Sequence, residues 1–515
     1  MKLSLHHRLL ALTLPLAALL AACDASPNDA RRPNIVLVVV DTLRGDMVLD
    51  GEADLETPGF DRLAEGGVVF PKAFSHAPMT LPSHTSLFSS RAPFETGVLN
   101  NWQEVPKDLP LLAEWLQRYD YQTRAVVSLG TLDSRKKGTL ARGFDVFDHD
   151  YWNIDQAPNA LKRIRSVLDD VDPEDPLFLF AHFSDPHAPY NLHDEEGQEA
   201  EIFLNGELLD RVPTSHMTQW KRRLPLEPGQ YTLEIRSEAP FRINAFDWKE
   251  RKRFLGPTWE VGQVRNREDY VRIVLDVDRP RNSVLRIWVA EAVQSLAEQR
   301  ERYRGEVRWM DRWVGDLSQE LRDRGLWDDT IVVFTSDHGE GLGEHGDVGH
   351  VQNLHDEMLH VPLVVKPAAG DPRYERLAAA RDELVPHLDI VPTLLDLAGI
   401  PLLPGASGSS LLRERDPLLV AETHKPEAKR NLICIRDDAY KLIYDVDAES
   451  FELFDMRADP DELVNVYDTL GHERPEWAER LRQIGELARS GAMLGGEASP
   501  ETQELLSALG YGGDA

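Results

Sequence analysis

Three uninterrupted aliphatic runs stand at wide intervals along the chain. They cover residues 35–40 ("IVLVVV"), 177–181 ("LFLFA") and 331–334 ("IVVF"), and none alternates apolar with polar positions. Such runs are typical of strands covered on both faces, as in a parallel sheet. The pattern therefore predicts three buried strands.

Helical periodicity fills the segments between these runs. Residues 109–120 have a helix-like pattern, and six later apolar residues recur at alternating spacings of four and three, as on one helix face: Tyr303, Val307, Met310, Val314, Leu317 and Leu321. Alternating strands and helices predict an α/β fold, with a mainly parallel central sheet flanked by helices.

The pattern changes between residues 191 and 290. "EIFLNGELL" predicts two short strands around an Asn205-Gly206 turn, and "PGQYTLEI", "DYVRIVLDV" and "SVLRIWVA" also have strand character. We expect an inserted β-sandwich here. It either recognises a ligand or only shapes or shields a cleft.

The other expected parts follow from the same patterns. Near the end, "AYKLIYDV" and "SFELFDM" predict an antiparallel pair, followed by a polar helical tail. The parts are a signal peptide (1–22), a linker (23–33), an α/β core in two portions (34–190 and 291–417), and a small C-terminal α+β subdomain with its tail (418–515).

The first residues have the features of an export signal. Lys2 and Arg8 precede an apolar run over residues 9–20 that is too short to span a bilayer. The run ends in "LAAC", which resembles a bacterial lipoprotein box. The resemblance implies lipidation of Cys23 and an exported protein anchored to a membrane of the bacterial cell envelope, facing the periplasm or the exterior. An ordinary signal peptide cut near Ala22 is the alternative.

Charge and cysteine content narrow the classes of partner. The 515-residue chain has a formal net charge of −31 and two cysteines. A disulfide framework is excluded, and a nucleic-acid partner is not expected because phosphates would be repelled. An anionic substrate must then be attracted locally. The oligomeric state does not follow from these features.

Polar residues of metal-ligand type follow each aliphatic run. Asp41 follows the first, Asp185 and His187 the second, and Asp337 and His338 the third. A single Asp after a strand is usually a turn or cap residue. However, ligands of open α/β sheets bind outside the carboxyl ends of the strands, so we expect these residues to meet at one edge of the sheet.

These residue types suit a divalent cation. Asp41, Asp337 and His338 offer two carboxylates and an imidazole, and Thr80 offers a fourth ligand. The mixed set favours Zn, Mn or Fe, with Ca or Mg possible.

Thr80 lies in "SHAPMTLPSHTSLFSS", which reads as the start of a helix with Pro82 near the first helical position. A metal lowers the pKa of bound water from about 15.7 to about 7, and an alcohol should respond similarly. The helix N-terminus also favours an anion. We therefore predict Thr80 as an activated nucleophile. A plain N-cap is the alternative.

Together these motifs resemble the sulfatase branch of the alkaline-phosphatase superfamily. The matching segments are "NIVLVVVDTLRGD", "APMTLPSHTSLFSS", "DPHAPY", "TSDHGEGLGEHG", "HVPLVV", "LVPHLDIVPTLLDLAGI" and "FELFDMRADPDE". The resemblance covers nearly all of the mature chain except the insert. It implies an α/β core, a metal at its edge, and attack on sulfur or phosphorus of an anionic ester.

Site roles follow from that resemblance by position. Asp41, Asp337 and His338 correspond to metal ligands, Thr80 to the nucleophile, and His187 to the residue that contacts the ester or protonates the leaving group. The following loop adds two catalytic candidates, His345 and His350, of which His350 falls near a lysine that binds the anion in many relatives. A loop-capping role for His350 is the alternative. Glu344 and His355 are weaker candidates.

The chain departs from active sulfatases at the nucleophile. Their Cys or Ser, in a C/S-x-P-x-R motif, is oxidised to formylglycine. Here Thr80 would give a ketone, and His84 replaces the arginine, so no formylglycine is expected. Thr42 replaces an aspartate and His338 an asparagine, and Lys136 and Lys137 are only candidates for another expected lysine. These features resemble phosphodiesterase and phosphotransferase relatives that use threonine directly, which favours phosphorus over sulfur. That resemblance implies one or two metal ions, with Asp185, His187 or a loop histidine as ligands of a second.

Two functions fit the sequence. The first is a metal-dependent hydrolase of sulfate or phosphate mono- or diesters with Thr80 as nucleophile. The second is a catalytically inactive sulfatase-like lipoprotein that binds an envelope glycan or polymer. The retained Asp41, Asp337 and His338 favour the hydrolase.

Overall fold

A computed structural model gives the fold of the protein. The residues it describes are 31–49, 55–132, 140–149, 156–188, 190, 199–214, 218–250, 253–254, 268–291, 295–415, 417–425 and 430–490. None of the helices within these ranges combines the length and the apolar character needed to cross a bilayer.

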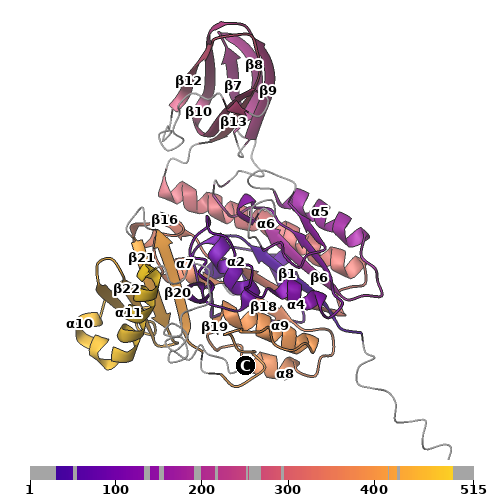
Figure 1. The fold of residues 1–515 in the computed structure, drawn as a ribbon, viewed down its shortest axis with the longest axis vertical. Helices are drawn as coiled ribbons and strands as arrows, with labels where there is room; N and C mark the ends of the chain where they lie inside the picture. The colour runs from indigo at the N-terminus through magenta and orange to yellow at the C-terminus, as the bar shows by residue number, and fades with distance from the viewer. Residues whose placement is uncertain are drawn as a thin grey trace, which may run out of the picture. The chain divides into compact units, whose positions relative to one another are not determined.

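A mixed, mainly parallel sheet forms the core (Figure 1). Its seven strands follow the order β2-β18-β14-β1-β6-β4-β5. Their bounds are β1 Asn34–Val40, β2 Val68–Val69, β4 Gln122–Val126, β5 Val146–Asp148, β6 Leu177–Phe183, β14 Thr330–Ser336 and β18 Leu363–Lys366. β18 alone runs opposite to the other six strands, so its pairings with β14 and β2 are antiparallel.

The three predicted strands are confirmed and are direct neighbours. β1 pairs in parallel with β14 on one side and β6 on the other, and Val40 lies opposite both Ser336 and Phe183. The three strands therefore end at the same level. The polar residues that follow them lie at one edge of the sheet, as parallel pairing requires.

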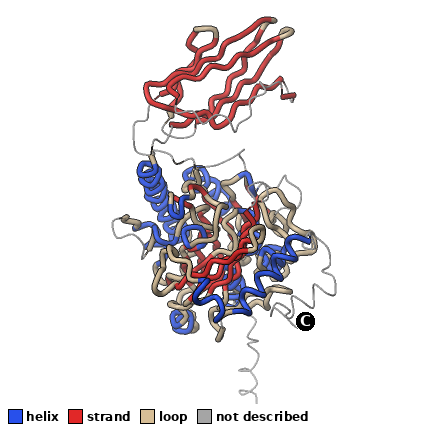
Figure 2. Tube along the Cα trace, turned by 90° about the vertical axis from the view of Figure 1, so that its left-hand side faces the viewer, coloured by secondary structure: helices blue, strands red, loops and turns tan. Residues whose placement is uncertain are grey.

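Helices cover both faces of this sheet (Figure 2). Ile35, Leu37 and Val39 of β1 belong to one apolar core, and Val36 and Val38 to the other, because successive side chains alternate across a strand. The first core is covered by α2 Thr80–Ser89, α4 Leu112–Gln117 and α9 Ile390–Ala398, and the second by α1 Pro58–Ala64, α5 Ala157–Asp169 and α6 Leu296–Asp323.

Two predicted helices are found, one of them shorter than expected. All six residues of the predicted apolar face lie on α6 and are fully buried, which confirms that helix. The helix expected over residues 109–120 covers only Leu112–Gln117. Pro110 precedes its start, and Asp120 has a positive φ of 64°, which a continuing right-handed helix does not allow.

The segment expected to be an inserted β-sandwich forms one seven-stranded antiparallel sheet with its own apolar core. Its strands are β7 Glu199–Leu204, β8 Glu207–Pro213, β9 Thr218–Leu226, β10 Gly229–Glu250, β11 Arg253–Phe254, β12 Glu268–Val277 and β13 Arg281–Glu291. The predicted Asn205-Gly206 turn joins β7 and β8, and both of its residues have positive φ. β10 pairs with β7 and β12 along its first half and with β13 along its second.

A four-stranded antiparallel sheet follows near the end of the chain. It contains β20 Leu419–Lys425, β21 Arg430–Arg436, β22 Tyr440–Asp445 and β23 Ser450–Asp455, so the predicted β22–β23 pair is confirmed. Helix α11, Pro475–Ser490, shares an apolar core with this sheet. Shorter elements are α3 Pro93–Thr96, α7 Asp356–Leu359, α8 Tyr374–Ala379, α10 Tyr467–Leu470, the three-stranded sheet of β3 Ala73–Phe74, β17 His360–Val361 and β19 Val385–Pro386, and the pair β15 Gly341–Leu342 and β16 Val348–Gly349.

Candidate active site

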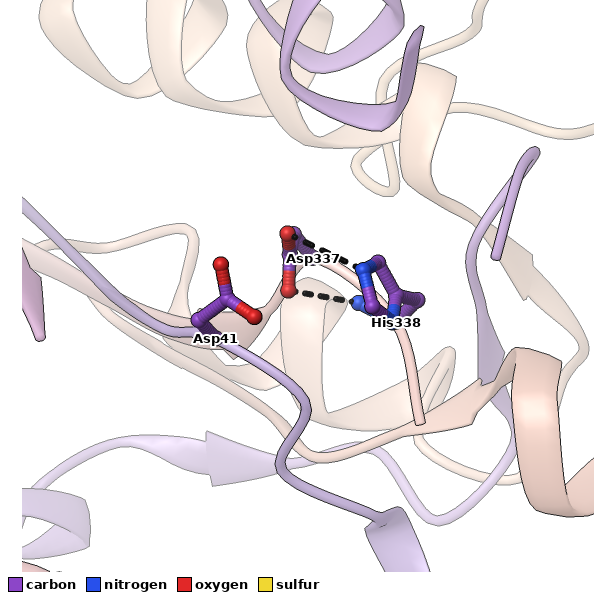
Figure 3. Close-up of side chains that lie close together, drawn as sticks. All are labelled: Asp41, Asp337 and His338. Atoms are coloured by element: carbon purple, nitrogen blue, oxygen red, sulfur yellow. Dashed lines mark hydrogen bonds and ion pairs between the residues drawn. The ribbon is translucent and has the colours of Figure 1, made fainter. Parts of the chain in front are cut away.

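Three ligand-type side chains meet at the ends of neighbouring strands. Asp41 follows β1, and Asp337 and His338 follow β14 (Figure 3). Each offers one ligand atom, and these atoms all lie within 4.8 Å of one another. All three side chains are fully buried. The sequence prediction that they come together is met by this geometry.

The turn after β1 fixes the orientation of Asp337. Thr42 has a positive φ of 58°, and its N–H donates to Asp337 Oδ1 at 3.1 Å. The N–H of His338 donates to the same oxygen at 2.9 Å. Tyr303 of α6 holds the turn by donating its hydroxyl to the Thr42 carbonyl at 2.7 Å. Oδ2 of Asp337 is thereby left to face His338 Nε2, 3.5 Å away.

The atoms that face one another lack hydrogen-bond partners. Within the described parts of the chain, Asp41 Oδ1, Asp337 Oδ2 and His338 Nε2 are buried without one. Such burial is costly unless another group satisfies the atoms. His338 Nδ1 donates to the Gly339 carbonyl at 2.9 Å, which leaves the lone pair on Nε2. This donor set fits a divalent cation.

Electrostatics favour a cation at the same place. Burial, and then the charge of Asp337, raise the pKa of Asp41 well above its ordinary value. Burial also raises the pKa of Asp337, and it lowers the pKa of His338 to about 3. The carboxylates thus carry unfavourable negative charge beside an imidazole that stays neutral. A bound cation would offset that charge while the neutral imidazole ligates it.

Thr80 lies beside this triad. It is buried, and its Oγ1 donates to Asp41 Oδ2 across 3.5 Å. The alternative of a plain N-cap is wrong, because Met79 occupies the cap position and Thr80 is the first residue of α2. Pro82 is accordingly the third helical residue rather than the first. Leu81 N–H donates to Asn101 Oδ1 at 2.8 Å, so a side chain satisfies one of the free N–H groups of the first turn.

A row of histidines extends from the triad. The ring of His350 lies 4.8 Å from that of His338 and 5.1 Å from that of His187, between ring centres. His350 Nδ1 contacts Glu340 Oε1 at 3.1 Å. Burial alone would raise the pKa of Glu340, but His350 and the other two imidazoles bring it below its ordinary value. Burial, and then His350, lower the pKa of His187.

Other candidates make contacts elsewhere. His345 Nδ1 lies 3.0 Å from Glu357 Oε1, and its ring stacks on that of His355 at 3.7 Å. Its catalytic role stays a prediction that these contacts do not favour. Glu344 pairs with Arg44 at 3.0 Å. Cys23, Lys136 and Lys137 lie outside the described residues.

Asp185 does not face the triad. Its carboxylate accepts from the Ala157 N–H at 2.9 Å and from Trp309 Nε1 at 3.0 Å, so it fixes the start of α5 against α6. Of the "DPH" segment, His187 alone joins the histidine row. Asp185 therefore gives no support to a second metal ion.

Sequence reasoning missed two buried histidines beside the acidic pair. His182, within β6, has Nε2 3.8 Å from Asp41 Oδ2, and His84 has Nδ1 3.6 Å from Asp337 Oδ2. Burial lowers the pKa of both. One signal was available: His182 is the one charge-capable residue in the apolar strand sequence "LFLFAHF".

Comparisons with known proteins agree with this geometry. The sulfatase family model matches residues 33–400, and the model of the C-terminal region of N-sulphoglucosamine sulphohydrolase matches residues 343–484. Arylsulfatase K of Gallus gallus is 25% identical over 88% of this chain and 82% of its own length. Choline-sulfatase of Rhizobium meliloti is 26% identical over 84% and 82%. The phosphonate monoester hydrolase structure of Agrobacterium radiobacter has a TM-score of 0.59 and 20% identity, covering 89% of this chain and 96% of that one.

Proposed function

The chain belongs to the sulfatase family of ester hydrolases, and we propose that it cleaves sulfate or phosphate esters with Thr80 as a metal-activated nucleophile. One observation carries the proposal: the Thr80 hydroxyl lies 3.5 Å from a carboxylate of a buried triad in which Asp41 Oδ1, Asp337 Oδ2 and His338 Nε2 have no hydrogen-bond partner among the described residues. A hydroxyl so placed can attack, whereas a capping hydroxyl would be turned to backbone N–H groups.

Asp41, Asp337 and His338 would hold the cation, with Thr80 as a further ligand. When bound, a divalent cation lowers the pKa of the threonine hydroxyl and offsets the charge of the ester. The mixed carboxylate and imidazole donors favour zinc, manganese or iron. We keep a single ion in the proposal, because Asp185 is committed to α5 and α6.

The chain's own residues then act in two steps. In the first, Thr80 Oγ1 gives up its proton and forms a bond to phosphorus or sulfur, and the bond to the alcohol oxygen breaks. In the second, water attacks the same atom, the bond to Oγ1 breaks, and Thr80 regains a proton. Asp41 Oδ2 is the acceptor nearest to that hydroxyl, so the hydrogen bond orients Oγ1 for attack.

His187 is placed to assist the departing alcohol. Its Nδ1 donates to the Ala188 carbonyl at 2.7 Å, which leaves Nε2 for the ester. Because burial lowers the pKa of His187, the free site holds a neutral imidazole. An incoming anionic ester favours the imidazolium, which can return a proton to the alcohol. His350, held by Glu340, lies against His187 and completes the proposed contacts to the anion.

The atom that Thr80 attacks is either phosphorus or sulfur. A threonine alkoxide suits phosphorus, because a sulfated threonine lacks the exit that an aldehyde hydrate provides. The names of the relatives, an arylsulfatase and a choline-sulfatase, support sulfate esters. A panel of 4-nitrophenyl sulfate, phosphate, phosphodiester and methylphosphonate, each with zinc, manganese, calcium and magnesium, separates these choices.

Thr80→Ala tests the nucleophile. We expect ester hydrolysis to fall by on the order of 10³-fold or more, while metal content stays near the wild-type value, since three protein ligands remain. Intact-protein mass spectrometry after acid quench should detect the substrate-derived group on the wild type and not on the variant. Wild-type turnover by Thr80→Ala would exclude the covalent route.

We also propose export and membrane attachment. The support is the apolar segment followed by "LAAC", which resembles a lipoprotein box and would place a lipid on Cys23. The enzyme would then face the periplasm or the exterior. Metabolic labelling with a palmitate analogue tests this, because a Cys23→Ala variant should lose both the label and its membrane fraction.

A further inference from the structure

A turn beside the proposed nucleophile presents a tryptophan to solvent. Trp102 is 88% exposed, the highest value among the exposed large apolar side chains of the described residues. Single exposed apolar residues are common and need no explanation by themselves. Trp102 differs from these in two respects: hydrogen bonds hold its turn in place, and one of them joins this turn to α2, which begins at Thr80.

The turn that carries Trp102 is held from within. Gln103 Oε1 accepts from the N–H groups of Leu99 and Asn100, at 2.5 and 2.9 Å, and Trp102 N–H donates to Asn100 Oδ1 at 3.0 Å. Two side-chain oxygens thus accept hydrogen bonds from three backbone N–H groups within one short segment. A rigid mount lowers the entropy lost when the indole ring contacts a ligand.

The same turn is tied to α2. Asn101 Oδ1 accepts from Leu81 N–H at 2.8 Å. Leu81 directly follows the proposed nucleophile Thr80, and Asn101 directly precedes Trp102. This hydrogen bond therefore joins the neighbour of Thr80 to the neighbour of Trp102. The turn that carries the indole therefore borders the first turn of α2, which begins at Thr80.

Polar groups beside the indole favour a hydroxylated ligand. Within the described residues, the side-chain hydrogen bonds of Asn100, Asn101 and Gln103 all use the amide oxygens. Their NH₂ groups therefore remain as donors. A flat aromatic face with several amide donors matches a sugar ring, which has a C–H face and hydroxyl groups at its edge.

We propose that Trp102 is a specificity-determining residue that stacks on a sugar ring in the alcohol part of the substrate. The inference rests on the proposed function for the position of the ester. The indole contributes to binding of the alcohol and takes no part in the bond-forming steps. It should thus act on KM and on kcat/KM for sugar esters, with little effect on esters of small acyclic alcohols.

The test compares wild type with Trp102→Ala on esters that differ only in the alcohol. The probes are glucose 6-sulfate and glucose 6-phosphate, ethyl sulfate and ethyl phosphate, and choline sulfate and phosphocholine. We expect kcat/KM for the glucose esters to fall about tenfold, mainly through KM, and for the ethyl esters to change less than twofold. Trp102→Phe should recover part of the loss. Leu463→Ala, at an apolar residue that is 73% exposed, is the matched control and should change nothing.

Three outcomes would overturn the inference. An equal loss on glucose and ethyl esters would mean that Trp102 only supports the Asn101–Leu81 contact. A larger loss on the choline esters would assign the indole to a cation instead. No loss on any substrate would remove Trp102 from the site.

A binding measurement separates this inference from the proposed chemistry. Thr80→Ala, loaded with metal, should bind the glucose esters without turning them over, and adding Trp102→Ala should weaken that binding about tenfold. If the wild type hydrolyses no ester while this difference in binding persists, the proposed hydrolysis by Thr80 is wrong and the sugar-binding role of Trp102 is supported. If the wild type hydrolyses the esters and Trp102→Ala has no selective effect, the proposed hydrolysis is supported and the role of Trp102 is refuted.

Discussion

Replacing His338 by asparagine changes one ligand of the proposed cation and leaves both carboxylates in place. His338 is fully buried, and the Gly339 carbonyl fixes its ring, so the imidazole reaches the site already oriented. Burial lowers its pKa to about 3, which keeps Nε2 free of a proton across the working pH range. An asparagine offers a shorter side chain and a hard oxygen instead of nitrogen.

The size of the effect follows from the number of ligands. Removing a residue that only orients a metal ligand typically costs 10- to 100-fold in affinity, so loss of a ligand should cost at least the upper end. We expect zinc or manganese affinity to fall by about 100-fold or more, or ~2.8 kcal/mol. Calcium or magnesium, which prefer oxygen, should lose less than about tenfold. The variant should therefore shift in preference from zinc and manganese toward calcium and magnesium, instead of binding all four metals more weakly by the same factor.

Competition titrations with a chromophoric chelator measure these affinities directly. His387→Asn is the matched control: His387 is equally buried and contacts Thr335 Oγ1 at 3.0 Å, outside the triad. Both variants should lose similar thermal stability, and only His338→Asn should lose zinc. Unchanged zinc affinity in His338→Asn, with the fold intact, would refute the assignment of Nε2 as a ligand.

Two further predictions concern the insert and the metal-free protein. Deleting residues 195–290 should change the choice among natural substrates more than turnover of a small aryl ester; equal loss on both would assign the insert a structural role. In chelated protein, burial raises the pKa values of Asp41 and Asp337, and the charge of Asp337 raises that of Asp41 further. Their contribution to stability is therefore full below the unfolded value of about 3.9 and is lost as pH rises through the folded values. The gain in melting temperature on adding metal should therefore grow as pH rises above the unfolded value of about 3.9, and a gain that stays constant would contradict this assignment of the two carboxylates.

The sheet was predictable because its central strands carry an unmistakable pattern. β1, β6 and β14 each contain an uninterrupted apolar run, and their adjacency follows from the way parallel strands deliver ligands to one edge. Asp41, Asp337 and His338 were found for the same reason. The short strands β2, β4 and β5 carried no such signal, since two to five residues show no readable period.

Orientation within the site could not be read from sequence. Asp41 and Asp185 both follow a central strand, yet one faces the triad and the other accepts from the start of α5. His345 and His350 share a loop, but His345 has a positive φ of 51° in a turn that carries it to Glu357, while His350 contacts Glu340. His182 was missed because a strand buried on both faces gives no alternation to mark an inward side chain.

The position of strands β7 to β13 in the chain affects how their sequence can change during evolution. They follow β6 and precede α6, inside the crossover that leads to β14, so no pairing of the central sheet is interrupted. Closure entropy grows only with the logarithm of length, and lengthening this link tenfold costs about 2 kcal/mol. The segment between β6 and α6 can therefore be replaced or lengthened without changing the register of β1, β6 and β14. It can evolve independently of the residues proposed to hold the cation.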